Sequence, residues 1–162
     1  MPGRLKRKRG HLIGVISDTH GLVRPGVIDA FRGVELIIHA GDVGKPEVLS
    51  ALQADAPVVA VRGNIDKGGW ARKLPETEVV EVGQFLFYVL HDIHRLDLDP
   101  AAAGFRAVIS GHSHQPSVEE RNGVLFLNPG SAGPRRFTLP VCVALLHLEE
   151  NSLKAELVEL KV

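Results

Sequence analysis

Short runs of apolar residues recur along the chain, and each of them ends in polar residues. The runs cover residues 12–16, 36–38, 58–61, 85–90, 107–109 and 124–127. Continuous apolar runs, in contrast to alternating ones, are typical of strands that are buried on both faces. The pattern therefore predicts core strands whose carboxyl ends carry clusters of polar side chains.

Two helices are predicted between the first three of these strands. Residues 25–31 and 46–54 both begin with proline and place apolar residues at helical spacing. Strands that alternate with helices in this way form a parallel sheet, and ligands bind at the carboxyl ends of the strands in such sheets. We therefore expect the polar clusters to converge on one site.

In the later part of the chain, pairs of apolar runs are separated by short turns, a pattern that is typical of β-hairpins. Residues 78–82 and 84–90 flank Gly83, residues 118–127 turn at Asn122-Gly123, and residues 141–148 precede a matching run at 153–160. We expect a second, antiparallel sheet from this part of the chain. The predicted fold is α/β (α+β), with two packed β-sheets flanked by helices.

Composition limits the class of protein. A chain of 162 residues that is 44% hydrophobic and 23% charged fits one globular domain. No apolar run approaches the roughly 18 residues that a membrane span requires. The first ten residues hold five of the 19 Lys and Arg, without an acid or an adequate signal-peptide core. We expect a cytoplasmic protein with a basic tail over residues 1–10 and a single domain over 11–162. The tail is either disordered or a salt-sensitive contact to nucleic acid.

The polar clusters contain a set of side chains that suits metal ions. They offer two carboxylates, one amide and four imidazoles, namely Asp18, His20, Asp42, Asn64, His91, His112 and His114. Oxygen and nitrogen donors without a thiolate suit manganese, iron, zinc, cobalt or nickel, and they disfavour a structural zinc site. Seven donors are more than one ion needs. The sequence therefore predicts a site for two divalent metal ions.

The order of these motifs resembles that of a known family. The segments are Ile-Ser-Asp-Thr-His-Gly at 16–21, Ala-Gly-Asp at 40–42, Val-Arg-Gly-Asn at 61–64, Gly-His-Ser-His at 111–114 and Asn-Pro-Gly-Ser at 128–131. Together they resemble the calcineurin-like metallophosphoesterase superfamily, and within it the small prokaryotic YfcE-type phosphodiesterases. The resemblance implies the family fold, a sandwich of two sheets with flanking helices.

The resemblance also implies a role for each donor. One metal would be bound by Asp18, His20, Asp42 and His114, and the other by Asp42, Asn64, His91 and His112. Asp42 would bridge the two ions. The expected catalytic residues, which would lie beside the reacting phosphate, are Asp42, Asn64 and His112. Members of the family hydrolyse phosphodiesters with metal-activated hydroxide and form no covalent intermediate. Manganese is the expected metal, with nickel, iron, zinc or cobalt as alternatives.

Further residues are expected around this centre. Substrate contacts are expected from Arg62, Asn128, Ser131, Arg135 and Arg136. The alternative is that Arg62 faces the edge of the core, and for Arg135 and Arg136 the favoured alternative is a solvated loop. Support for the ligands is expected from His39, Asp92 and His94. Asp92 stands where small relatives commonly have the glycine of His-Gly-His, which makes His94 a displaced counterpart of the second histidine.

The residue after Gly63-Asn64 is a second departure from the family pattern. Larger relatives have a histidine there as a candidate general acid, and this chain has Ile65. An isoleucine cannot transfer a proton, and general acid catalysis contributes about 10²- to 10⁴-fold to a rate. We therefore expect slow hydrolysis of esters with basic leaving groups.

Two other functions are compatible with these motifs besides that of a small-molecule phosphodiesterase. The chain is also similar to the small phosphoesterase-like subunit of retromer, which uses this fold as a non-catalytic protein-binding scaffold. In such scaffolds the bridging aspartate and the asparagine ligand are typically altered, but Asp42 and Asn64 are both intact here. This favours catalysis. A nuclease that uses the basic tail to hold its substrate is the other alternative, and deletion of residues 1–10 would weaken nucleic-acid cleavage only in that case.

Overall fold

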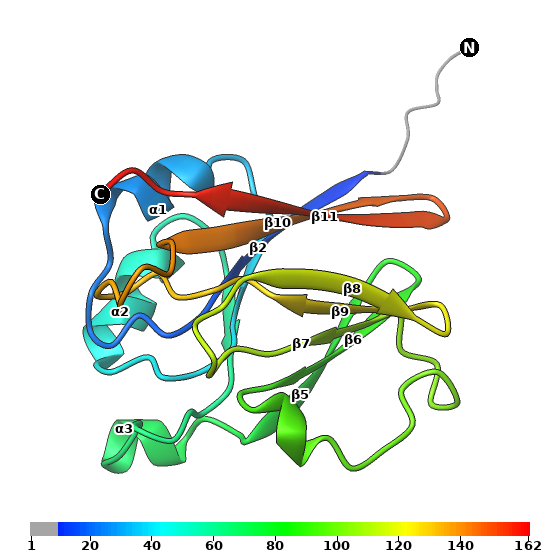
Figure 1. Ribbon diagram of the computed structural model, residues 1–162, viewed down its shortest axis with the longest axis horizontal. Coiled ribbons are helices and arrows are strands. Elements are labelled where there is room, and N and C mark those ends of the chain that lie inside the picture. The colour runs from blue at the N-terminus through cyan, green and yellow to red at the C-terminus, as the bar shows by residue number, and fades with distance from the viewer. Residues whose placement is uncertain (1–9) are drawn as a thin grey trace.

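The computed structural model describes residues 10–162, which form two five-stranded sheets packed against each other (Figure 1). The first sheet has the order β11-β10-β2-β3-β4 and consists of β2 (His11–Ile16), β3 (Leu36–His39), β4 (Val58–Ala60), β10 (Cys142–Glu149) and β11 (Ser152–Glu159). The second has the order β5-β6-β7-β9-β8 and consists of β5 (Thr77–Val82), β6 (Phe85–Leu90), β7 (Ala107–Ile109), β8 (Ser117–Arg121) and β9 (Val124–Asn128). The expected fold class is confirmed.

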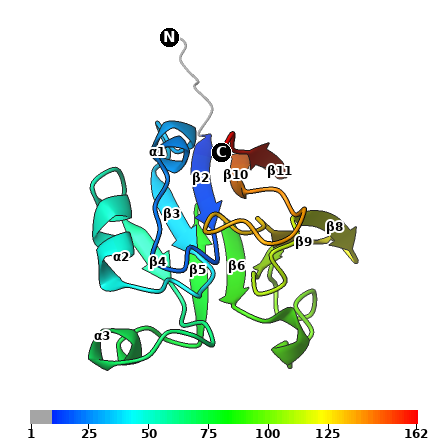
Figure 2. The ribbon, with the colours of Figure 1, turned by 60° about the vertical axis from the view of Figure 1, so that its left-hand side comes forward.

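Helices cover the outer face of the first sheet. α1 (Pro25–Ala30) and α2 (Pro46–Gln53) begin at the prolines that predicted them and lie side by side on that face (Figure 2). A four-residue helix, α3 (Gly69–Arg72), follows β4. On the outer side of the second sheet, the described part of the chain has a single short 3₁₀ helix, η1 (Ile93–Arg95), where a small apolar cluster surrounds Leu90 and Val108. Within residues 10–162 no helix has the length and apolarity needed to cross a bilayer.

The expectation that the second sheet is antiparallel was wrong. Its three central strands, β6, β7 and β9, are parallel, and only the edge strands β5 and β8 pair in antiparallel hairpins. The C-terminal hairpin of β10 and β11 extends the first sheet instead, with β10 antiparallel to β2. The physical reason is burial: β10 is apolar and buried along most of its length, and a central position beside β2 covers both of its faces.

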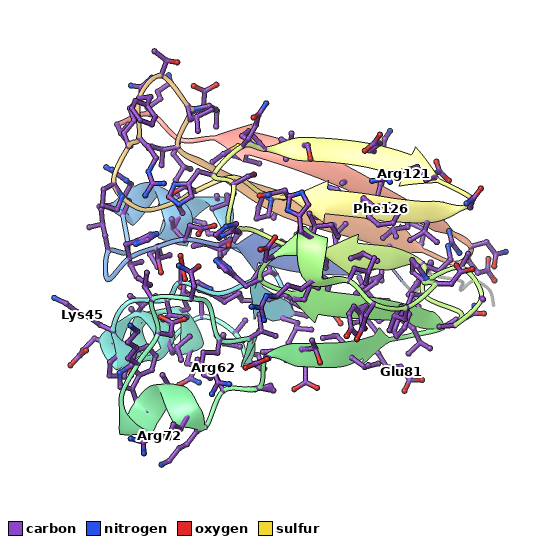
Figure 3. The ribbon with its side chains drawn as sticks, turned by 60° about the horizontal axis from the view of Figure 1, so that its bottom comes forward. Lys45, Arg62, Arg72, Glu81, Arg121 and Phe126 are labelled. Carbon is purple, nitrogen blue, oxygen red and sulfur yellow. The ribbon has the colours of Figure 1, made fainter. Side chains whose placement is uncertain are left out.

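Two clusters of apolar residues hold the layers together. The larger one lies between the sheets and joins Ile13, Val15 and Ile38 of the first to Phe87 and Ile109 of the second. The other lies beneath the helices and includes Phe31 and Leu52. The edge strand β8 of the second sheet is exposed to solvent along its whole length. There the Arg121 guanidinium lies 4.3 Å from the centre of the Phe126 ring of β9 (Figure 3).

Candidate metal centre

All seven predicted metal ligands lie in loops that follow parallel strands. β2, β3 and β4 are parallel in one sheet, and β6, β7 and β9 are parallel in the other. The loops after five of these strands carry the ligands: Asp18 and His20 after β2, Asp42 after β3, Asn64 after β4, His91 after β6, and His112 and His114 after β7. Because both sheets present the carboxyl ends of these strands to the same end of the sandwich, the loops meet there.

Five of these residues have a left-handed backbone, which side chains other than glycine rarely adopt. Their φ angles are 56° at Asp18, 49° at His20, 58° at Asp42, 71° at His112 and 65° at His114. Each such residue costs about 1–3 kcal/mol, and the cost is tolerated where the surroundings determine the conformation. Strain of this kind concentrates at functional sites.

The two aspartates are each held through one oxygen. Asp18 Oδ2 accepts hydrogen bonds from Ser17 Oγ at 2.7 Å and from the His112 backbone N–H at 3.0 Å. Asp42 Oδ1 accepts one from the Ile65 backbone N–H at 3.1 Å. These bonds leave Asp18 Oδ1 and Asp42 Oδ2 for other partners.

The free oxygens face the ring nitrogens of three histidines. Asp18 Oδ1 lies 3.4 Å from His114 Nε2, and 3.9 Å from both His20 Nε2 and His91 Nε2. Asp42 Oδ2 lies 3.6 Å from His20 Nε2 and 3.4 Å from His91 Nε2. The donors form two compact groups, Asp18 with His20 and His114, and Asp18 with Asp42 and His91.

These residues fit divalent cations, because several of their buried polar atoms have no partner in the protein. Within the described residues, Asp18 Oδ1, His20 Nε2, His91 Nε2 and His114 Nδ1 are buried without a hydrogen bond. Each such atom costs about 1–3 kcal/mol. His91 Nδ1 lies 2.8 Å from the carbonyl oxygen of Ala40, which can only accept, so the proton is on Nδ1 and Nε2 keeps a lone pair for a metal.

The charges of the centre also favour a cation. Burial alone would lower the pKa of His91, but the carboxylates of Asp42 and Asp18 raise it above its ordinary value. Burial alone would raise the pKa of Asp42, but the His91 ring, whose Nε2 lies 3.4 Å from Asp42 Oδ2, and the Ile65 backbone N–H hold it below its ordinary value. The pocket of carboxylates thus stabilises positive charge at the point where the free donor atoms face one another.

Asn64 and His112 lie on the solvent side of the centre, outside the two compact groups. The His112 side chain is 45% exposed, and its ring contacts that of His91 at a centroid distance of 5.1 Å. Asn64, His91 and His112 line a pocket of about 530 Å³. Arg62 and Asp92, which the sequence analysis names, also line it, whereas sequence reasoning missed other lining residues, among them Glu76, Thr77, Tyr88, Arg95 and Asp97.

The five residues expected to contact substrate are in three different environments. Arg62, which is labelled in Figure 3, is among the residues that line the pocket. Its Nη2 donates to Glu76 Oε2 at 2.9 Å. Arg135 and Arg136 are exposed in the loop before β10 and are not among the residues that line the pocket.

Asn128 and Ser131 are buried, and their side chains hold the ligand loops. Asn128 Nδ2 donates to the Gly111 carbonyl at 2.9 Å, and Ser131 Oγ donates to the Asp18 carbonyl at 3.0 Å. The geometry therefore gives these two residues a positioning role. Substrate contact by any of the five stays a prediction.

The three expected supporting residues also differ. His39 is fully buried behind the centre, while Asp92 lies at its mouth. The His94 side chain is 88% exposed, and its contacts are with Asp92, through Nδ1 at 3.2 Å and the backbone N–H at 3.0 Å. The structure therefore directs His94 away from the buried donors.

Asp66 is a buried residue of the site that the sequence reasoning missed. Its carboxylate accepts hydrogen bonds from the backbone N–H groups of Val43 at 3.1 Å, Gly44 at 2.9 Å and Gly63 at 2.9 Å. It therefore ties the Asp42 loop to the Asn64 loop. The only sequence signal is an aspartate in a turn that follows a glycine, which is too common to single out.

The burial of His39 predicts that the free energy of unfolding decreases at acidic pH. The Thr19 hydroxyl donates its proton to the Val43 carbonyl, so Thr19 Oγ1 accepts a hydrogen bond from His39 Nε2 at 3.0 Å. His39 Nδ1 accepts a hydrogen bond from the Gly41 N–H at 3.1 Å. Burial lowers the His39 pKa to about 4, against the partial opposition of the charge on Asp18. Below about pH 6.5 the unfolded chain binds a proton that the folded chain excludes. Stability is therefore complete above that pH and falls as the pH drops towards 4, by up to about 1.4 kcal/mol per unit.

Urea unfolding of the metal-free protein at pH 7.5 and pH 5 measures this effect. His39→Gln should be less stable than the parent at pH 7.5 and should lose less stability on going to pH 5. His147→Gln, at a half-exposed histidine on β10 that pairs with Glu156, is the matched control and should keep the parent's pH dependence. An unchanged pH dependence in His39→Gln would contradict the assignment.

Comparisons with known proteins identify the family of this chain. Residues 12–151 match the calcineurin-like phosphoesterase superfamily domain. A probable metallophosphoesterase of Methanothermobacter thermautotrophicus is 38% identical, over 91% of this chain and 91% of the relative. The phosphodiesterase MJ0936 of Methanocaldococcus jannaschii is 31% identical, over 73% of this chain and 82% of the relative.

Solved structures share the same architecture. Vacuolar Protein Sorting 29 from Cryptosporidium parvum superposes with a TM-score of 0.80 at 22% identity, over 94% of this chain and 92% of that one. At that identity the likeness concerns the fold alone. The family is shown by the match over residues 12–151 and by the sequence identity to the two archaeal relatives. The chain belongs to the calcineurin-like phosphoesterase superfamily.

Proposed function

We propose that this chain is a phosphodiesterase that depends on two divalent metal ions. The observation that carries the proposal is the convergence of buried donor atoms that have no hydrogen-bond partner among residues 10–162, three of them on residues with a left-handed backbone. Asp18, His20, Asp42 and His114 would bind one ion, and Asp42, Asn64, His91 and His112 the other. The short distances from Asp42 Oδ2 to His20 Nε2 and to His91 Nε2 suit a bridge between the two sets. Manganese accepts this donor set, as do nickel, iron, zinc and cobalt.

The residues of the chain fix the donors before any substrate arrives. When bound, two such ions polarise a phosphoryl oxygen and activate water near neutral pH. Ser17 and the His112 N–H orient Asp18, and the Ile65 N–H orients Asp42. The Ala40 carbonyl sets the tautomer of His91. A centre oriented in this way needs little rearrangement during the reaction, and its preorganisation supports catalysis.

The substrate is expected to enter through the pocket that Asn64 and His112 line. These two candidate ligands are exposed, whereas Asp18, Asp42, His91 and His114 are buried. The pocket volume of about 530 Å³ falls in the range of small-molecule sites, which is about 300–1,000 Å³. A small phosphodiester therefore fits, with one ester group beside Arg62. The name of the archaeal relative MJ0936, a phosphodiesterase, supports the same substrate class.

The leaving group is expected to limit the rate, because Ile65 supplies no proton. Ile65 is 40% exposed beside Asn64, and its backbone N–H is used by Asp42. Bis-p-nitrophenyl phosphate should therefore react at least about 10²- to 10⁴-fold faster than a dialkyl phosphodiester, because only the alkyl leaving group depends strongly on the missing general acid. Ile65→His should narrow that ratio and leave the aryl rate close to that of the parent. Equal rates for the aryl and alkyl diesters in the parent protein would rule out this account of Ile65.

Hydrolysis of bis-p-nitrophenyl phosphate by metal-stripped protein, with and without added Mn²⁺, separates an enzyme from a scaffold. We expect turnover that requires the metal. A folded protein that binds Mn²⁺ and hydrolyses neither diesters nor monoesters would favour a non-catalytic scaffold. Hydrolysis of p-nitrophenyl phosphate alone would place the activity among the monoesterases and refute the proposed substrate class.

A further inference from the structure

Asp92 is fixed through one of its two carboxylate oxygens. Asp92 Oδ1 accepts a hydrogen bond from the His94 backbone N–H at 3.0 Å and lies 3.2 Å from His94 Nδ1. Asp92 is thus the N-cap of η1, directly after the candidate ligand His91. The cap determines which way the carboxylate points.

The other oxygen, Asp92 Oδ2, points to the candidate ligand His112. It lies 4.0 Å from His112 Nε2, and the residues that the structure describes give it no hydrogen bond. Asp92 lies at the mouth of the pocket, where an aspartate side chain carries its ordinary negative charge at neutral pH. The gap of 4.0 Å is longer than a hydrogen bond, and a small side-chain rotation or one bridging water molecule would close it.

The ring of His112 is therefore positioned from three directions. Its backbone N–H is held by Asp18 Oδ2 at 3.0 Å, its ring meets that of His91 edge-on, and its Nε2 faces Asp92. An imidazole that donates its Nε2–H to a carboxylate offers Nδ1 as its only metal-binding atom, and it is a stronger ligand for that reason.

We propose that Asp92 is a positioning residue for the metal ion that His112 binds. The inference rests on the proposed two-metal site and goes beyond it. The side chain that replaces the family's glycine would orient the most exposed histidine ligand and add negative charge beside it. Asp92 would thereby raise the affinity of one metal site and leave the other unchanged.

Asp92→Asn separates this role from that of a helix cap. Asparagine caps helices as well as aspartate does, so η1 should be retained. With its oxygen engaged by the His94 N–H, the asparagine presents an NH₂ group to His112, which cannot accept a proton from Nε2. Asp97→Asn is the matched control, because Asp97 is an exposed acid that lines the same pocket and has no contact with His112 within 4.0 Å.

Calorimetric titration of the metal-stripped variants with Mn²⁺ provides the first readout. Asp92→Asn should weaken one of two binding steps about 10- to 100-fold, which is the usual loss when a ligand loses its supporting partner. The other step should stay within about twofold of the parent. Asp97→Asn should change neither step by more than that.

NMR of the Zn²⁺-loaded protein provides a second readout that does not depend on activity. In the parent protein, His112 Nε2–H should give a resolved resonance, because the carboxylate protects that proton from exchange with water. The resonance should be lost in Asp92→Asn and kept in Asp97→Asn.

The results also distinguish failure of this inference from failure of the proposed function. The role of Asp92 would be overturned if Asp92→Asn bound Mn²⁺ like the parent and kept the resonance. It would also be overturned if Asp92→Asn and Asp97→Asn weakened both Mn²⁺ sites to the same extent. Neither result would contradict the proposed enzymatic activity. A parent protein that binds no second metal and hydrolyses no diester would instead refute the proposed function.

Discussion

Replacing Asp42 with asparagine is expected to abolish most of the phosphodiesterase activity and to weaken both metal sites. Asp42 Oδ2 lies 3.6 Å from His20 Nε2 and 3.4 Å from His91 Nε2, so it faces donors of both proposed sets. Loss of a residue that only supports a ligand costs about 10- to 100-fold in affinity or activity. Loss of a shared ligand should cost more, and we expect the hydrolysis rate to fall by at least about 100-fold.

The rate of bis-p-nitrophenyl phosphate hydrolysis, measured with Mn²⁺ in excess, checks this prediction. Asp29→Asn is the matched control, because it makes the same chemical change at a surface residue that pairs with Arg32. Its activity should equal that of the parent. If Asp42→Asn kept more than a tenth of the parent's activity at saturating metal, Asp42 would not be the bridging ligand.

The second large effect is expected at Gly111. A Cβ atom at this position would overlap Ser17 Oγ and lie 2.7 Å from Asp18 Oδ2, at the point where the loop after β7 packs against the loop after β2. Asp18 would have to move, and with it the oxygen that faces His20, His91 and His114. We expect Gly111→Ala to lose most of the activity and to lower the free energy of unfolding by about 1–3 kcal/mol, which is typical of overpacking.

Gly69→Ala is the control for this substitution. Gly69 begins α3, and a Cβ there would have no heavy atom within 4 Å. Urea unfolding should give a free energy equal to or slightly above that of the parent, and activity should not change. Full activity in Gly111→Ala would show that the Asp18 loop does not depend on this close approach.

The position of the site could be predicted from the sequence, because its signals are local. Each of Asp18, Asp42 and His112 follows an apolar run within a few residues, and parallel strands bring such loops to one end of a sheet. The left-handed φ angles of these residues could not be predicted, since they arise from packing between loops that are far apart in the sequence.

The pairing of the strands needed information that local patterns do not contain. A hairpin signal shows that β10 pairs with β11, but not that β10 also pairs with β2, from which it is separated by more than a hundred residues. The roles of Asn128 and Asp66 were hidden for the same reason. Both hold backbone groups of distant loops, and only the folded chain brings those groups to them.

The central claim is that two metal ions at this centre drive phosphodiester hydrolysis, and a metal titration of activity tests it most directly. Metal-stripped protein at a concentration well above the metal dissociation constants is titrated with Mn²⁺, and bis-p-nitrophenyl phosphate hydrolysis is followed at each step. We predict a rate that rises until two equivalents of Mn²⁺ per chain are bound and then stays constant. Full activity at one equivalent, or no hydrolysis at any ratio with Mn²⁺, Ni²⁺, Fe²⁺, Co²⁺ or Zn²⁺, would contradict the account.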